Sequence, residues 1–145
     1  MAVSAKLYGN VPLKFANKEI DWDTDTIKVA LCTSSYTPDQ DADEYYDDIT
    51  NEVANGNGYT TGGATLGTKT NTYTGATNVS KFDAADVTWS SSTITARYAV
   101  IYCSTGTAST SALIGYVDFG EDKVSDNGNF TITWDAAGIF TATVA

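Results

Sequence analysis

The sequence lacks histidine, and it contains only two cysteines, two prolines and one arginine in 145 residues. Without histidine there is no Ser-His-Asp or Cys-His catalysis and no imidazole ligand for a metal. The two cysteines, Cys32 and Cys103, are too few for a four-thiolate zinc site and too far apart for CxxC chemistry. Both fall in expected strands, so we expect two buried thiols. The sequence therefore predicts a protein that is not an enzyme and needs no cofactor or metal.

Positive charge is also scarce, since 18 acidic residues stand against 8 basic ones and give a formal charge of −10. Nucleic acids and anionic membranes are bound largely through Lys and Arg, so neither is an expected partner. No apolar run approaches the roughly 20 residues that span a bilayer. The first ten residues, MAVSAKLYGN, also lack the charged-then-apolar pattern of an export signal.

What the sequence does contain is typical of β-structure. It has 23 Thr, 9 Tyr and 12 Gly, and Thr and Tyr favour half-buried strands. Apolar residues alternate with polar ones in short runs, and turn clusters separate the runs at the spacing of a sandwich or barrel. We therefore predict a single all-β domain, a β-sandwich or barrel of about seven or eight mainly antiparallel strands. Its expected core residues are Val29, Leu31, Val87, Trp89, Val100, Ile101, Ile132 and Trp134.

The run 94–103 is the most apolar segment and is expected to be a central strand. Strict alternation assigns its side chains to two faces of the sheet. One face would hold Ile94, Ala96, Tyr98, Val100 and Tyr102, and the opposite face Ala99, Ile101 and Cys103.

The chain divides into an N-terminal arm or short helix over 1–20 and a sandwich domain over 21–145. The domain carries a long acidic insertion loop at about 33–58. Within that loop Tyr45, Ile49 and Val53 recur every fourth residue, which predicts a short helical turn docked by one apolar stripe.

Two features of the turns could bind ligands. Asp21, Asp23 and Asp25 alternate like the first ligands of a calcium loop, but an EF-hand would then require Gly and Glu where Thr26 and Cys32 stand. A looser calcium site and a polar turn both remain open for these aspartates. The glycine-rich run GYTTGGATLG lacks the lysine of a phosphate-binding loop, so its glycines are expected to permit positive φ at a bend.

Several stretches together resemble a family of small structural proteins of tailed bacteriophages. They are W-D-x-D-x-I-K-V-A-L from Trp22, D-I-T-N-E-V from Asp48, G-Y-T-x-G-G from Gly58, VTWSSSTITARYAVIY, LIGYVDFGEDK and FTITWDAAGIF. The resemblance covers about residues 19–140. It implies a virion structural protein, assembled in the cytoplasm of a host bacterium, and it implies no catalytic residues.

The function predicted from this resemblance is a capsid decoration or cement protein that binds the outer surface of the phage head. The alternatives are a tail, collar or fibre-associated protein and a carbohydrate-binding surface module. Expected partners are the major capsid protein or other virion proteins, and further copies of the chain in a homo-oligomer, for which a trimer would match local threefold positions. The expected interface combines apolar and aromatic residues of the N-terminal segment and the acidic connection, with charges at its rim: Leu7, Tyr8, Leu13, Phe15, Tyr36, Tyr45 and Tyr46.

Overall fold

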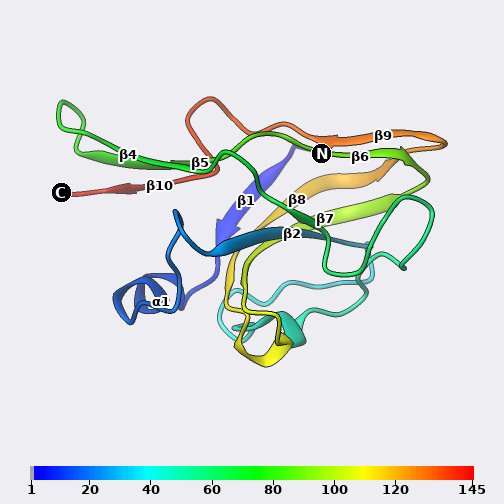
Figure 1. Ribbon diagram of the computed structural model, residues 1–145, viewed down its shortest axis with the longest axis horizontal. Coiled ribbons are helices and arrows are strands. Elements are labelled where there is room, and N and C mark those ends of the chain that lie inside the picture. Colours follow the sequence, from blue (N-terminus) through cyan, green and yellow to red (C-terminus); the bar gives the residue numbers. More distant parts are fainter. Residues whose placement is uncertain (1) are drawn as a thin grey trace.

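The computed structural model describes residues 2–145, and the regular secondary structure of these residues is nearly all β-strand (Figure 1). The elements in chain order are β1 (Ser4–Leu7), α1 (Val11–Ala16), β2 (Thr26–Cys32), η1 (Tyr46–Asp48), β3 (Ala64–Thr65), β4 (Thr70–Thr74), β5 (Val79–Asp83), β6 (Val87–Ser92), β7 (Thr95–Ser104), η2 (Ala108–Thr110), β8 (Leu113–Val124), β9 (Gly128–Ile132) and β10 (Phe140–Thr143). In this described part of the chain, no helix has the length and apolar character needed to cross a membrane.

Three antiparallel sheets form two layers. The larger layer is a five-stranded sheet in the order β1-β8-β7-β2-β3. The smaller layer contains the β6-β9 pair, and a three-stranded sheet, β10-β5-β4, extends to one side of it (Figure 1). The predicted all-β sandwich in one domain is confirmed. Residues 2–145 form ten strands where seven or eight were expected, because strands as short as the two-residue β3 leave no alternating pattern in the sequence.

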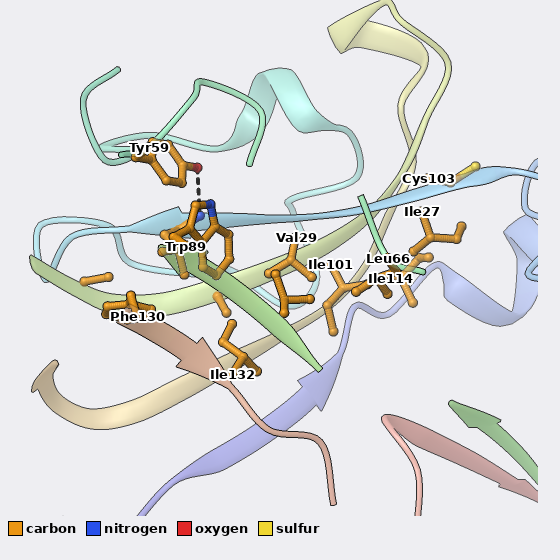
Figure 2. Close-up of a cluster of buried hydrophobic side chains, with 14 of the residues drawn as sticks. Ile27, Val29, Tyr59, Leu66, Trp89, Ile101, Cys103, Ile114, Phe130 and Ile132 are labelled. Atoms are coloured by element: carbon orange, nitrogen blue, oxygen red, sulfur yellow. Dashed lines mark hydrogen bonds between the residues drawn. The ribbon is translucent and has the colours of Figure 1, made fainter. Parts of the chain in front are cut away.

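The main core lies between the layers. Figure 2 shows Val29, Ile101 and Ile114 of the five-stranded sheet on one side, and Trp89, Phe130 and Ile132 of the β6-β9 pair facing them. These side chains are at most 7% exposed.

One predicted core residue departs from this pattern. All the predicted core residues are buried except Trp134, which is half-buried at the edge of the main core. Strand β9 ends at Ile132, so Trp134 lies beyond the strand, where its indole N–H donates to the carbonyl of Ala85 at 3.1 Å.

The strict alternation predicted for 94–103 is wrong at its N-terminal end. Ile94 and Ala96 face the main core together with Ala99, whereas Val100 faces the opposite side of the sheet. The cause is an irregularity in the pairing with β8. Ala96 lies opposite Lys123, whereas Tyr98, two residues later, lies opposite Asp118, so the register shifts between them. Extra residues on one strand change which face the neighbouring side chains occupy.

The N-terminal segment is part of the sandwich. Strand β1 pairs with β8 at the edge of the five-stranded sheet, and α1 follows with Pro12 in its first turn, a position that tolerates proline. The predicted short helix within 1–20 is therefore present, although residue 1 of that range lies outside the described residues.

The glycine-rich run forms the tight bend that was expected of it. Gly62 and Gly63 have φ values of +91° and +74°, and a Cβ on Gly63 would lie 1.7 Å from the carbonyl oxygen of Val29. Only glycine can bring the chain this close to the centre of β2. This bend starts β3 at the outer edge of the sheet.

Trp89 of β6 and Trp134, which follows β9, provide a test of the core assignment. Trp89→Ala should lower the free energy of unfolding by about 3–5 kcal/mol, because a large side chain that is 6% exposed leaves a cavity. Trp134→Ala should cost clearly less, because this indole is already half exposed. Urea unfolding of both variants measures the difference, and equal losses would contradict the placement of Trp134.

Candidate interaction surface

The outer face of the five-stranded sheet is covered by the N-terminal segment and by the acidic connection, defined here as residues 33–58. The packing forms a second hydrophobic cluster, separate from the main core. Its buried members are Tyr8, Val11, Ala30, Cys32, Tyr36, Val100, Tyr102 and Leu113. The sheet therefore has buried side chains on both faces, and Cys32 and Cys103 are free, buried thiols.

A chain of hydroxyl groups joins the N-terminal segment to the acidic connection. The hydroxyls of Tyr8 and Tyr36 lie 2.9 Å apart, and that of Tyr36 donates to the Asp43 carboxylate at 2.8 Å. Both tyrosines are 2% exposed. Burial raises the pKa of each phenol above its ordinary value of 10.0. These two side chains are committed to contacts within the protein.

Glu52 ties the acidic connection to the sheet. Its carboxylate accepts hydrogen bonds from the hydroxyl of Tyr59 at 2.6 Å, from the backbone N–H of Gly62 at 2.7 Å and from the hydroxyl of Tyr46. The Tyr59 hydroxyl in turn accepts the backbone N–H of Leu31 at 2.9 Å, the bond drawn in Figure 2. One carboxylate therefore fixes the connection, the glycine bend and β2 relative to one another.

A buried lysine joins α1 to the same connection. Lys14 is 5% exposed, and its ammonium group contacts the carboxylates of Glu19 at 3.0 Å and Glu44 at 3.8 Å and the hydroxyl of Tyr45. Burial lowers the pKa of Lys14, but the hydrogen bonds with Tyr45 and Glu19 outweigh that effect and leave the pKa above its ordinary value. Lys14 is thus an internal contact between the N-terminal segment and the acidic connection.

The seven predicted interface residues occupy very different environments. Tyr8 and Tyr36 are buried, and Leu13 is 57% exposed. The others are partly buried and pack against one of the two clusters, namely Leu7, Phe15, Tyr45 and Tyr46. Aromatic residues outside the strands were expected to be free for a partner, but the connections that carry them cover a sheet face. Among the seven, Leu13 is the side chain that a partner can reach without repacking.

The two aspartate series form turns of the same construction. The Asp21 carboxylate accepts the backbone N–H groups of Asp23 and Thr24 at 3.1 Å, and the Asp25 carboxylate accepts that of Asp21 at 2.8 Å. Asp39 and the residues up to Asp43 repeat this arrangement. Carboxylates that accept N–H groups of their own turn stabilise it without an ion. Within residues 2–145, no group of three His, Cys, Asp or Glu side chains is placed to hold a metal.

A groove that the sequence did not indicate opens along the edge of the sandwich. It has a volume of about 680 Å³ and runs between β1, β8 and the chain after β9. Its apolar walls reach the main core through Phe119, Phe130 and Ile132, and Lys123 and Asp135 are its charged residues. Alternation correctly indicated that the β9 residues are apolar on one face, but not that the layers separate at this edge.

The chain was compared with family models, curated proteins and solved structures. No protein-family model, no curated protein and no solved structure matches the chain. The function of this protein is therefore inferred from its own residues and their contacts.

Replacing the carboxylate of Glu52 tests its role in holding the connection. Glu52→Gln should lower the free energy of unfolding by about 1.5–3 kcal/mol, the range for hydrogen bonds to charged groups, because an amide accepts fewer of the three N–H and O–H donors. Glu121→Gln is the control, since Glu121 is 62% exposed and forms a surface ion pair with Lys123; it should leave stability nearly unchanged. Equal effects of the two substitutions would contradict the role of Glu52.

The buried phenols and thiols predict a loss of stability at alkaline pH. A group whose pKa is raised by folding stabilises the protein below its unfolded pKa, and this contribution is lost as pH rises towards the folded pKa. Folding raises the pKa of Cys32 and Cys103 from 9.0 to about 12. The phenols with raised pKa, relative to 10.0, are Tyr8, Tyr36, Tyr46, Tyr59, Tyr102 and Tyr116.

The free energy of unfolding should therefore fall steadily from about pH 9 upward. Tyrosinate absorbance of the buried phenols should appear together with the unfolding transition seen by circular dichroism. Complete tyrosine ionisation at a pH where the protein is still folded would contradict these burial assignments.

Proposed function

We propose that this protein is a non-enzymatic structural component of a tailed-bacteriophage virion and that it binds the outer surface of the head as a decoration or cement protein. It would then be assembled in the cytoplasm of the host bacterium, with the major capsid protein as its main partner. The proposal starts from the sequence resemblance, and the contacts of the motif residues add support.

The observation that carries the proposal is that the motifs behind the resemblance meet in one set of structural contacts. Glu52 belongs to D-I-T-N-E-V, Tyr59 and Gly62 belong to G-Y-T-x-G-G, and Leu31 ends the I-K-V-A-L run. These residues are linked by the hydrogen bonds around the Glu52 carboxylate. Motifs that build a fold, and do not surround a reactive group, are consistent with a family defined by a structural role.

The physical properties of the domain suit that role. A domain with clusters on both faces of its main sheet buries much of its apolar surface and resists unfolding. Its charge of −10 keeps free subunits apart in solution before they find a particle. Exposed Leu13 lies on α1, whose Lys14 pairs with Glu44 of the acidic connection, and exposed Lys18 follows the helix, so this segment offers an apolar anchor among charges.

Imaging of intact virions tests the proposal most simply. Gold-labelled antibodies against the protein should decorate the head at regular positions in electron micrographs. Label confined to the tail or its fibres would support the alternative of a tail-associated protein and overturn head decoration. Particles without label would overturn both.

Binding to heads that lack the protein tests the contact surface. Leu13→Asp should weaken binding about tenfold or more, because burying a leucine side chain contributes about 1.5–3 kcal/mol and a charge opposes burial. Val124→Asp is the matched control, since Val124 is 66% exposed at the far end of β8. Both variants should keep the unfolding midpoint of the wild type. Unchanged binding of Leu13→Asp would remove α1 from the contact surface.

A further inference from the structure

The three-stranded sheet β10-β5-β4, called the arm here, differs from the rest of the protein in its burial. Its base is covered, because Phe82 and Phe140 stack at 4.3 Å and contact Phe15 of α1 and Trp22. Away from this base, every residue of β4 is exposed and so are the last three residues of β10. In Figure 1 this end of the arm extends away from the five-stranded sheet.

The exposed part of the arm has no core of its own. The register places Tyr73 opposite Ser80 and Ser80 opposite Ala142, on the same face as Phe82 and Phe140. Tyr73 and Val144 on this arm are 58% and 61% exposed. Three strands are stable on their own when one face is hydrophobic and covered or when a helix packs on them. The outer arm has neither, so it would gain stability from a further strand.

The arm also carries little charge for a strongly acidic protein, since the charged side chains of its three strands, Lys81 and Asp83 of β5, form an ion pair at 3.4 Å. Residues 70–80 and 141–144 contain no Asp, Glu, Lys or Arg, although the chain carries 26 charged residues as 18 acidic and 8 basic. Two copies with a charge of −10 each repel one another over most of their surfaces. The arm is where two copies approach with the least repulsion.

None of the three usual protections of a free strand edge is found within β4. Exposed edges normally carry lysine, proline or a bulge, which prevents pairing with another chain. Strand β4 is TNTYT and pairs with β5 in regular register. The opposite edge of the arm is less open, because Phe140 and Thr141 of β10 line a cleft of about 250 Å³ together with Leu7 of β1.

We propose that the free edge of β4 pairs antiparallel with β4 of a second copy of this chain. Each copy contributes three strands to one continuous sheet, with a twofold axis at Thr72, the centre of the strand. An antiparallel edge-to-edge contact of identical strands is self-complementary, so it closes at two copies and leaves no free β4 edge. This pairing of β4 edges does not depend on the proposed role in a virion.

A lysine on the β4 edge tests the proposal. In sedimentation velocity, the wild type should reach about twice its mass of 15.4 kDa as its concentration rises from micromolar to millimolar. Thr72→Lys should remain a monomer, since two lysines would face each other across the axis. Thr141→Lys is the matched control, an exposed threonine of the same arm on β10, and should dimerise like the wild type.

The salt dependence of dimerisation provides a second, independent test. Because the copies repel one another through their net charge, added salt should strengthen the dimer, whereas it would weaken an interface held by ion pairs. A wild type that is monomeric throughout at high salt would overturn the proposal. So would a Thr72→Lys protein that dimerises normally, or a Thr141→Lys protein that dissociates.

A crosslink keeps the test decisive if a lysine disturbs the arm. Directly opposed residues of antiparallel strands have Cα atoms about 4.5–5.5 Å apart, within the range of a disulfide. Under mild oxidation, Thr72→Cys should form a covalent dimer, and Thr141→Cys should not, since β10 lies at the opposite edge of the arm. The native cysteines are buried and should not crosslink. Equal crosslinking of the two variants, or none in Thr72→Cys, would contradict pairing about Thr72.

Discussion

The hydrogen bonds of the Glu52 carboxylate hold together parts of the chain that would otherwise be independent. The carboxylate accepts donors from Tyr46 in the acidic connection and from Tyr59 and Gly62 around the glycine bend. Tyr59 reaches β2 through the N–H of Leu31. Placement of the connection over the outer sheet face, and burial of the tyrosines beneath it, both depend on this arrangement. A long segment without strands is thus anchored to the sheet by side-chain hydrogen bonds.

The sequence predicted the strands well where one face of a sheet packs on the main core. Val87, Trp89 and Ile132 follow the period-two pattern, and the structure buries them. The pattern was misleading at Ala96, because a bulge is a property of strand pairing and leaves no local signal.

The candidate surface was harder to predict. The tyrosines of the connection can be identified from the sequence but their hydrogen-bond partners cannot, since the contact between Tyr8 and Tyr36 joins residues 28 positions apart. The Glu52 carboxylate accepts from two tyrosine hydroxyls and one glycine N–H, and no spacing of residues in the sequence indicates such a site. The charge-free stretch 70–80 of the arm, in contrast, can be found from composition alone, because it lacks any charged side chain.

Amide hydrogen exchange tests most directly whether the acidic connection is part of the folded core. The backbone N–H of Gly62 donates to Glu52 and that of Val53 donates to the Leu31 carbonyl at 2.8 Å. Both amides should exchange as slowly as those in the central strand β7, and much more slowly than the exposed turn at 75–78. Exchange of Gly62 and Val53 at the rate of that turn would show that the connection is a loose loop and would contradict this account.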